Sequence, residues 1–326
     1  MRKLLVVMAS LAGCAGLKPV LVDASVQKPS NVAVYFTVDT VRGQPVPGLT
    51  AEQFHIYEDD KLVSVFESKQ TILNPEVAAR HYTLLLVDMS GSVLQSGQLP
   101  ALQQAVNDFT SRVEKLQETA VYAFDGRAEL VPLRAFGPGG GAVNLSGFSS
   151  TDPSTNLNGA VVKGLDLLRA QLERSPTPLR FGTLVVFTDG TDHAHRVTSS
   201  DALRAVAEAP FDVFAIGVGA EVDPAELYAI GKSGAATSKD PGAVGAQFEA
   251  IATKIEGYAK RFYLLSYCSP ARAGEHVLTI EPFLVDGQKG KMQYRFKADG
   301  FGPQCDPNRK PNFDVLHPRV AKPTKN

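Results

Sequence analysis

The chain has 326 residues, of which 44% are hydrophobic and 21% are charged, a composition typical of a globular protein with a sizeable core. This length allows one large domain or two smaller ones. The formal net charge of −1 lacks the strong positive field that attracts nucleic acid, so we expect no nucleic-acid partner. After the N-terminus, the sequence contains no apolar segment long enough to cross a bilayer.

Residues 1–13 are predicted to be an export signal, with two positive residues followed by a short apolar stretch. The segment 11–14, Leu-Ala-Gly-Cys, resembles the lipobox of bacterial lipoproteins, in which the cysteine is acylated and becomes the new N-terminus. This resemblance implies a lipid anchor on Cys14 and a place in the bacterial cell envelope. Ala15 replaces the aspartate of an inner-membrane retention signal, which favours the outer membrane. The alternatives are an ordinary secretory signal or a cysteine present by chance.

Residues 14–29 lack a strong hydrophobic period, and we expect them to form a tether. The segments 31–38, 54–58 and 62–67 are predicted to form a strand and then a hairpin. A sheet of this size is marginal alone. The β-sandwich part at residues 30–76 therefore requires strands from elsewhere in the chain.

Between residues 80 and 260, buried strands alternate with amphipathic helices. This alternation predicts an α/β fold with a doubly wound, mostly parallel sheet and helices on both faces. The expected strands are 82–87, 119–124, 128–131, 183–187 and 212–218. The expected helices are 99–116, 157–174, 200–209, 224–231 and 243–260.

Oxygen-bearing side chains follow two of the buried strands and precede one helix. They are Asp88, Ser90, Ser92, Thr155 and Asp189. Open α/β sheets bind ligands at the carboxyl ends of their strands. A hard cation such as Mg2+ takes about six oxygens, of which usually only one or two come from carboxylates. The five side chains therefore predict a site for Mg2+ or Mn2+ that leaves one position for an outside group.

The order Asp-x-Ser-x-Ser, then a distant Thr, then a distant Asp resembles the metal-ion-dependent adhesion site (MIDAS) of von Willebrand factor type A (VWA) domains. All five positions are filled here. The resemblance implies a VWA, Rossmann-like fold and a metal-dependent adhesion or protein-binding module. It also implies that an acidic residue of a protein partner completes the coordination of the metal.

Each part of this pattern also has a simpler interpretation. Asp-x-Ser-x-Ser is a common turn composition, and Thr155 by itself suits a helix N-cap. His193 and His195 have a spacing that suits a transition metal, but a solvated loop is the favoured interpretation. A second functional hypothesis is a structural scaffold of an envelope assembly, in which the metal rigidifies three loops.

We expect no enzymatic activity. The sequence has no Gly-x-Ser-x-Gly nucleophile elbow and no His-Glu-x-x-His zinc helix. Asp88 follows a strand, as a phosphoryl nucleophile of a haloacid dehalogenase does, but Ser90 stands where that family needs a second acid.

After the α/β region, the segments 261–267, 276–281 and 290–297 are strand-like. They are predicted to form the second part of the β-sandwich, residues 261–301, which completes the first part at residues 30–76. The α/β domain is then inserted in the sandwich or packed on it. This succession resembles bacterial exported proteins in which a small β region with a Pro-Val-x-Gly-Leu-Thr turn precedes a VWA domain.

Cys268 and Cys305 form an even pair in an exported protein, where disulfides persist. We expect them to pair, the alternative being two free thiols. Residues 302–326 are rich in Pro, Lys and Asn, and we expect a disordered tail.

Overall fold

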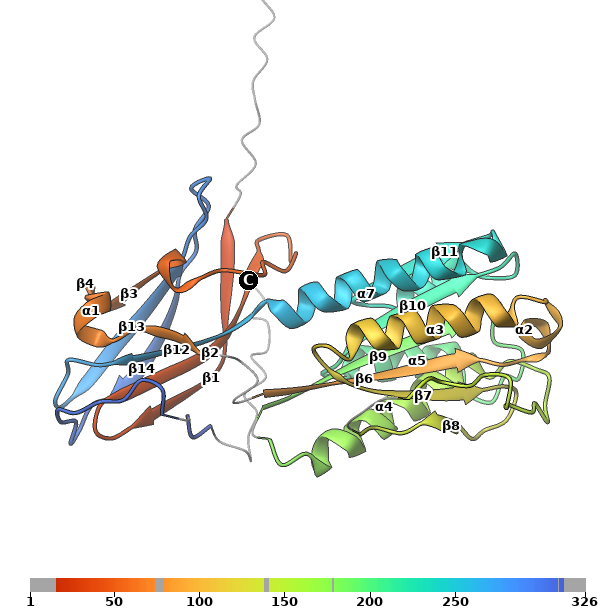
Figure 1. Cartoon of the computed structure of the whole chain (residues 1–326), viewed down its shortest axis with the longest axis horizontal. Coiled ribbons are helices and arrows are strands. Elements are labelled where there is room, and N and C mark those ends of the chain that lie inside the picture. Colours follow the sequence, from red (N-terminus) through yellow and green to blue (C-terminus); the bar gives the residue numbers. More distant parts are fainter. Residues whose placement is uncertain (1–15, 74–78, 138–140, 178, 310, 314–326) are drawn as a thin grey trace, which may run out of the picture. The chain divides into compact units, whose positions relative to one another are not determined.

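The computed structural model describes residues 16–73, 79–137, 141–177, 179–309 and 311–313. Within these ranges, no helix is both long and apolar enough to span a membrane. The described chain divides into two compact units (Figure 1). Residues 16–73 and 260–313 form the β unit, and residues 79–259 form the α/β unit. The sequence placed these boundaries at residues 76–80 and 260–261.

The α/β unit contains a six-stranded sheet in the order β11-β10-β9-β6-β7-β8. Every neighbouring pair is parallel except β7 and β8. The strands are β6 (Ala79–Asp88), β7 (Glu118–Phe124), β8 (Val131–Arg134), β9 (Leu179–Thr188), β10 (Asp212–Val218) and β11 (Gly234–Ser238). This arrangement confirms the predicted fold class of a mostly parallel α/β sheet.

Helices cover both faces of this sheet (Figure 1). The helices are α2 (Gly91–Gln95), α3 (Leu99–Val113), α4 (Leu157–Arg174), α5 (Ser199–Glu208), α6 (Pro224–Ile230) and α7 (Val244–Lys260), with a 3-10 turn at Pro241–Ala243. Side chains of one strand alternate between two cores because successive strand residues point to opposite faces. Leu85 and Val87 pack with α3 and α7, whereas Leu84 and Leu86 pack with α4, α5 and α6.

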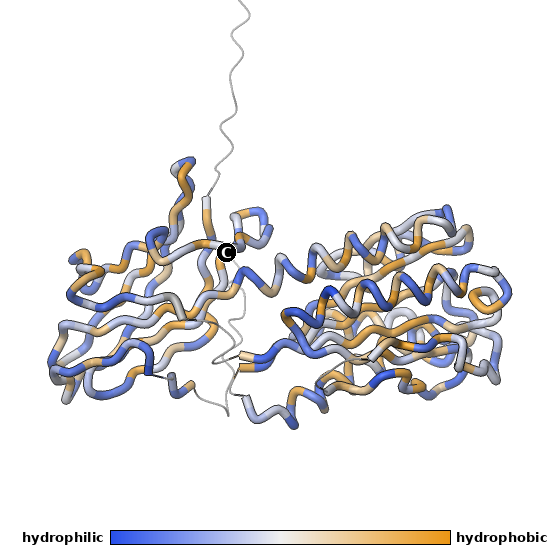
Figure 2. The backbone as a smooth tube through the Cα atoms, viewed as in Figure 1, coloured by the Kyte–Doolittle hydropathy of each residue, from blue (hydrophilic) through white to orange (hydrophobic). Residues whose placement is uncertain are grey.

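The central strands of this sheet are buried on both faces and carry long hydrophobic stretches (Figure 2). Such continuous apolar runs are typical of parallel sheets covered by helices. Asp88 ends β6 and Asp189 directly follows β9, so the carboxyl ends of these two strands carry both predicted carboxylate ligands.

The β unit is a sandwich of two four-stranded sheets. One sheet has the order β1-β2-β12-β5, with β1 (Leu17–Gln27), β2 (Asn31–Thr40), β12 (Phe262–Cys268) and β5 (Thr71–Leu73). The other has the order β14-β13-β3-β4, with β14 (Met292–Lys297), β13 (Glu275–Pro282), β3 (Phe54–Glu58) and β4 (Lys61–Leu62). A single core joins Phe36 and Tyr263 of the first sheet to Ile56 and Ile280 of the second.

The expected tether at residues 14–29 is wrong for most of its length, because Leu17–Gln27 forms β1 and pairs with β2 along the whole strand. Within β1 the register shifts between Leu21 and Asp23, and Asp23 and Ser25 are both buried. Polar residues at these positions interrupt the apolar alternation from which a strand is recognised. Cys14, the expected lipidation site, lies outside the described residues.

A further expectation in the β unit, the strand at residues 62–67, is wrong. The second hairpin strand shrinks to Lys61–Leu62 and is followed by a helical turn, α1 (Val65–Ser68). The Ser64 hydroxyl accepts a hydrogen bond from the Glu67 N–H at 3.4 Å and caps this turn. A 3-10 turn at Ala51–Gln53 precedes β3.

The described part of the expected disordered tail is packed on the β unit. Gly302 N–H donates to the Pro29 carbonyl at 2.7 Å, and Phe313 is 2% exposed. Cys305 forms a disulfide with Cys268, as the sequence led us to expect. These contacts order the segment although its composition is polar.

Two edge strands of the α/β sheet also differ from expectation. β8 begins at Val131, where the predicted strand 128–131 ends. It contains Pro132, which is tolerated because β8 is an antiparallel edge strand. β11 was not predicted, since Gly-Ala-Ala-Thr-Ser has little β propensity.

Candidate metal centre

The candidate site is built at the carboxyl ends of β6 and β9, which are hydrogen-bonded neighbours in the sheet. Their parallel register pairs Val87 with Phe187, so the next residues, Asp88 and Thr188, also lie side by side. The Thr188 hydroxyl donates a hydrogen bond to Asp88 Oδ2 at 2.7 Å. The sheet register therefore brings together two segments that are 100 residues apart in the sequence.

A chain of hydrogen bonds runs from Asp88 through the following loop to Asp189. Asp88 Oδ1 accepts the Ser90 N–H at 2.9 Å. The hydroxyls of Ser90 and Ser92 lie 3.1 Å apart, and the Ser92 hydroxyl donates to Asp189 Oδ1 at 2.9 Å. Four of the five predicted ligands are thus joined directly to one another.

Thr155 reaches this site through the backbone of its loop. The Gly91 N–H donates to the Pro153 carbonyl at 2.8 Å, which holds the Thr155 loop against the Asp-x-Ser-x-Ser loop. The Thr155 carbonyl accepts the N–H groups of His193 and Ala194, each at 2.9 Å. The segment that follows Asp189 is therefore bound to Thr155 as well.

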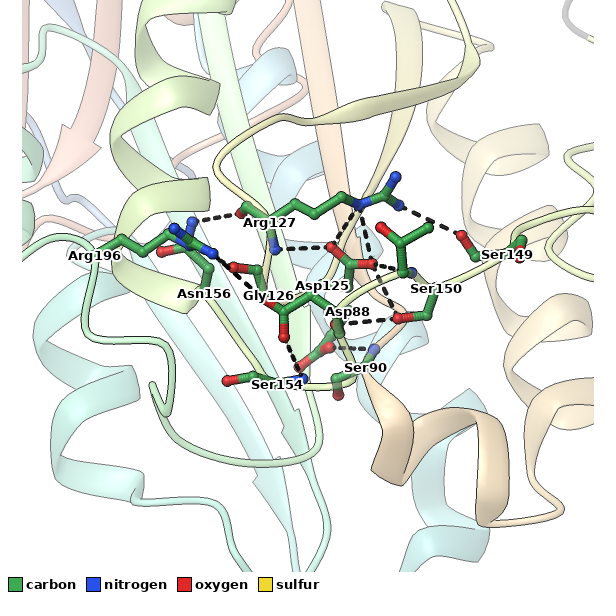
Figure 3. A network of polar contacts seen from close by, with 12 residues as sticks. Asp88, Ser90, Asp125, Gly126, Arg127, Ser149, Ser150, Ser154, Asn156 and Arg196 are labelled. Atoms are coloured by element: carbon green, nitrogen blue, oxygen red, sulfur yellow. Dashed lines mark hydrogen bonds and ion pairs between the residues drawn. The ribbon is translucent and has the colours of Figure 1, made fainter.

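Asp125, at the end of β7, fixes the loop that leads to Thr155 (Figure 3). Its buried carboxylate accepts the Arg127 N–H at 2.9 Å, the Ser150 hydroxyl at 3.0 Å and the Thr151 N–H at 3.3 Å. Arg127 Nε also forms an ion pair with it at 2.9 Å. The Asp125 carbonyl accepts the Asn156 N–H at 3.1 Å, so one residue holds both ends of the segment 150–156.

Arg196 adds a second brace to the same loop (Figure 3). Its guanidinium donates to the Gly126 carbonyl and forms an ion pair with Asp152 at 3.2 Å. Asp192 acts in the same region, since its buried carboxylate accepts the N–H groups of Asn158 at 3.0 Å and His195 at 2.9 Å. Protein hydrogen bonds thus hold all three loops of the site in place.

The electrostatics of the site favour a cation. The pKa of Asp88 is raised to about 7, mainly by burial; the nearby Asp189 carboxylate adds to this rise, and the hydrogen bond from Thr188 opposes it. Burial also raises the pKa of Asp189, and the charge of Glu221 adds to this effect. Two neighbouring carboxylates that resist ionisation are stabilised in their charged form by a positive ion between them.

The donor set fits a hard divalent cation. In an octahedral site with metal–oxygen distances of about 2.1 Å, neighbouring ligand oxygens are about 3 Å apart. The Ser90–Ser92 and Ser92–Asp189 oxygen pairs lie 3.1 and 2.9 Å apart. Across the described ranges, no three His, Cys, Asp or Glu side chains cluster as a metal site would, so the candidate depends on two carboxylates and neutral hydroxyls.

The sequence did not identify Thr188 or Asp192 as parts of the site. In the sequence, Thr188 is indistinguishable from an ordinary strand residue. Only the register between β6 and β9 shows that its hydroxyl reaches Asp88. A carboxylate directly after a buried strand was the one available signal for Asp125.

No protein-family model and no curated protein matches the sequence. Solved structures similar to this chain include a von Willebrand factor type A protein from Catenulispora acidiphila, which is 10% identical over 89% of this chain and 75% of that chain, with a TM-score of 0.43. Manganese-loaded TRAP protein from Plasmodium vivax is 13% identical over 72% of this chain and 98% of that chain, with a TM-score of 0.43.

Proximal thread matrix protein 1 from the mussel byssus, in a structure with a zinc-occupied MIDAS motif, is 18% identical with a TM-score of 0.42. The similarity covers 62% of this chain and 49% of that chain, so this chain spans about half the length of the byssus protein.

Proposed function

We propose that the α/β unit binds Mg2+ or Mn2+ and uses it to capture an acidic side chain of a protein partner. The ligands in this proposal are Asp88, Ser90, Ser92, Thr155 and Asp189. The observation that carries it is the chain of hydrogen bonds that joins two carboxylates through the Ser90 N–H and two serine hydroxyls at the end of the sheet.

Burial differs along this chain of ligands in a way that suits capture. Asp88 is fully buried, whereas Ser92 is exposed and Asp189 is partly exposed. A bound cation supplies positive charge for an incoming carboxylate. Asp88 and Asp189 balance this charge, and the hydroxyls add oxygens without further negative charge. The partner would approach from the side of Ser92 and Asp189.

The arrangement of the loops supports partner capture over the scaffold alternative. In the scaffold hypothesis the metal rigidifies the three loops. Asp125, Asp192 and Arg196 already connect these loops through protein hydrogen bonds and an ion pair. A metal is not needed to hold them together, so its proposed role is to bind the partner. The proposal assigns no catalytic step to the protein.

We also propose that the protein is lipid-anchored at Cys14 in the bacterial cell envelope, with the outer membrane as the favoured site. The support is the lipobox-like segment 11–14 in the sequence. The first described residue, Gly16, follows Cys14 by two positions and leads directly into β1. An anchor at Cys14 would therefore hold the β unit close to the membrane surface.

Partner capture is tested by immobilising the protein and exposing it to envelope extract in Mg2+ or in EDTA. The same partner should be retained in Mg2+, released by EDTA and absent from Asp88→Ala and Asp189→Ala columns. Both variants must first be shown to be folded by their far-ultraviolet circular dichroism. Retention that persists in EDTA or in folded Asp189→Ala would contradict a metal-mediated contact.

A further inference from the structure

A hollow of about 280 Å3 lies in the α/β unit and shares residues with the candidate metal centre. Ser92 and Asp189 belong to both. The other walls come from the segment between α2 and α3, the loop after β10 and the start of α7. Small-molecule sites are usually about 300–1,000 Å3, so this hollow suits a single side chain of a larger partner.

The floor of the hollow is apolar. It is formed by Val93, Leu102, Phe187, Val218 and Val244, which come from five different segments. Each of these side chains is at least 95% buried. They belong to the core on the α3 and α7 face of the sheet, so the floor is set by packing that does not depend on a ligand.

The rim of the hollow is acidic. Glu221 is exposed and lines it together with Asp189, and no Lys, Arg or His is among the described residues that line it. The Glu221 carboxylate lies close to Gly190, the residue after Asp189. Its Oε2 atom is 3.9 Å from the point that a Cβ atom would occupy on Gly190. Glu221 takes part in none of the ion pairs found within the described ranges.

The start of α7 does not reverse this charge. A helix N-terminus carries partial positive charge that disfavours a cation. The Asp240 carboxylate accepts the Gly242 N–H at 2.9 Å and so adds a negative charge at this end. Asp189 is balanced when a divalent cation is bound, which leaves Glu221 as the main charge facing the hollow.

We propose that this hollow binds a lysine or arginine side chain of the partner, adjacent in sequence to the acidic residue captured by the metal. The aliphatic stem packs on the apolar floor, and the cationic head lies at Glu221. Long basic side chains combine these two properties, because their stems are apolar and their charge is at the end. This inference rests on the proposed function and adds the chemical class of the second contact.

The test uses three short peptides that each carry a single Asp, flanked on both sides by Lys, Leu or Gly. Dissociation constants are measured by calorimetry in saturating Mg2+. The Lys peptide should bind at least about fivefold more tightly than the Gly peptide, and Asn in place of Asp should abolish binding. Glu221→Gln should remove the advantage of Lys over Leu. The matched control, Glu208→Gln, replaces an exposed glutamate on α5 and should preserve this advantage.

The outcomes separate the two proposals. If the folded wild-type protein binds no Mg2+, both are overturned. If it binds Mg2+ and all three Asp peptides equally, the basic subsite is overturned while metal-dependent capture stands. Tightest binding by the Leu peptide, or a Lys advantage that survives Glu221→Gln, would also overturn the assignment of a cation to this hollow.

Discussion

Asp88 is the residue on which the metal site depends most, because it is fully buried and joins two loops. Its two oxygens accept different donors, the Ser90 N–H and the Thr188 hydroxyl. A buried carboxylate that is held in this way has a fixed orientation but resists carrying charge. This combination makes both the stability of the protein and its metal affinity depend on pH.

The free energy of unfolding of the metal-free protein should fall as pH rises from about 4 to about 7. The folded pKa of Asp88, about 7, lies above its ordinary value of 3.8. The folded state therefore retains a proton over this range that the unfolded state releases, and it loses stability as that proton is removed. Mg2+ affinity should rise over the same range, because the metal needs the carboxylate.

Urea unfolding in EDTA at pH 5 and pH 8 measures this dependence. Asp88→Asn is the control, since it keeps the shape of the side chain and removes its titration. Other carboxylates also titrate, so the decisive quantity is the difference between wild type and variant. An identical pH dependence in both proteins would show that Asp88 does not titrate with a raised pKa.

Thr188→Val should weaken Mg2+ binding, because Asp88 loses the hydroxyl that orients its Oδ2 atom. Residues that support metal ligands in this way typically change affinity by about 10-fold or more. The comparison is with Thr183→Val, which alters the middle of the same strand. Calorimetric titration should show the loss for Thr188→Val only. Equal affinities of the two variants would argue against a positioning role for Thr188.

At the scale of elements, the sequence predicted the strands that carry the site and missed others. β6, β9 and β10 were predicted because their apolar runs are continuous, as burial on both faces requires. β1 was missed because Asp23 and Ser25 occupy buried positions, and β11 because its residues are small. The ligand residues were predicted from their positions after strands, whereas the hydrogen bonds between loops depend on tertiary register.

Asp125 has a structural role that extends to metal binding through the loop that carries Thr155. Burial raises the pKa of this carboxyl, but hydrogen bonds from Arg127 and Ser150 outweigh it and keep the pKa below its ordinary value. In Asp125→Asn these donors lose a charged acceptor, which typically costs about 1–3 kcal/mol of stability. We expect the folded variant also to bind Mg2+ more weakly, because the segment 150–156 is less firmly held.

The measurement is Mg2+ titration at a temperature where the variant is folded, together with urea unfolding. Asp152→Asn provides the comparison, since the Asp152 carboxylate pairs with Arg196 at the more exposed edge of the same loop. It should produce the smaller effect on both quantities. A loss of stability in Asp125→Asn with unchanged Mg2+ affinity would limit Asp125 to a folding role.

At the scale of the whole molecule, the α/β unit is inserted in the sequence between the two segments that form the β-sandwich. The sequence predicted this interruption because strand-like segments occur on both sides of the α/β pattern. It did not predict that residues 302–309 and 311–313 would be ordered. Their order comes from the disulfide, from buried Phe313 and from a hydrogen bond to Pro29, which are contacts that composition does not reveal.

Replacing both Cys268 and Cys305 by Ser should destabilise the β unit and leave Mg2+ binding unchanged. The crosslink spans 37 residues, and a loop of this size contributes at most about 4 kcal/mol by restricting the unfolded chain. All five proposed metal ligands lie in the other unit. Thermal unfolding and calorimetry of the double variant measure the two effects. A clear fall in Mg2+ affinity would show that the site depends on the sandwich.

The most direct test of the proposed function is a calorimetric titration of Mg2+ and Mn2+ into the wild-type protein and into Asp88→Ala at pH 8. We expect saturable binding with one cation per chain in the wild type and none in the folded variant. Circular dichroism should show the same secondary structure for both proteins. No binding to the folded wild type, or equal binding to Asp88→Ala, would contradict a metal centre built on Asp88.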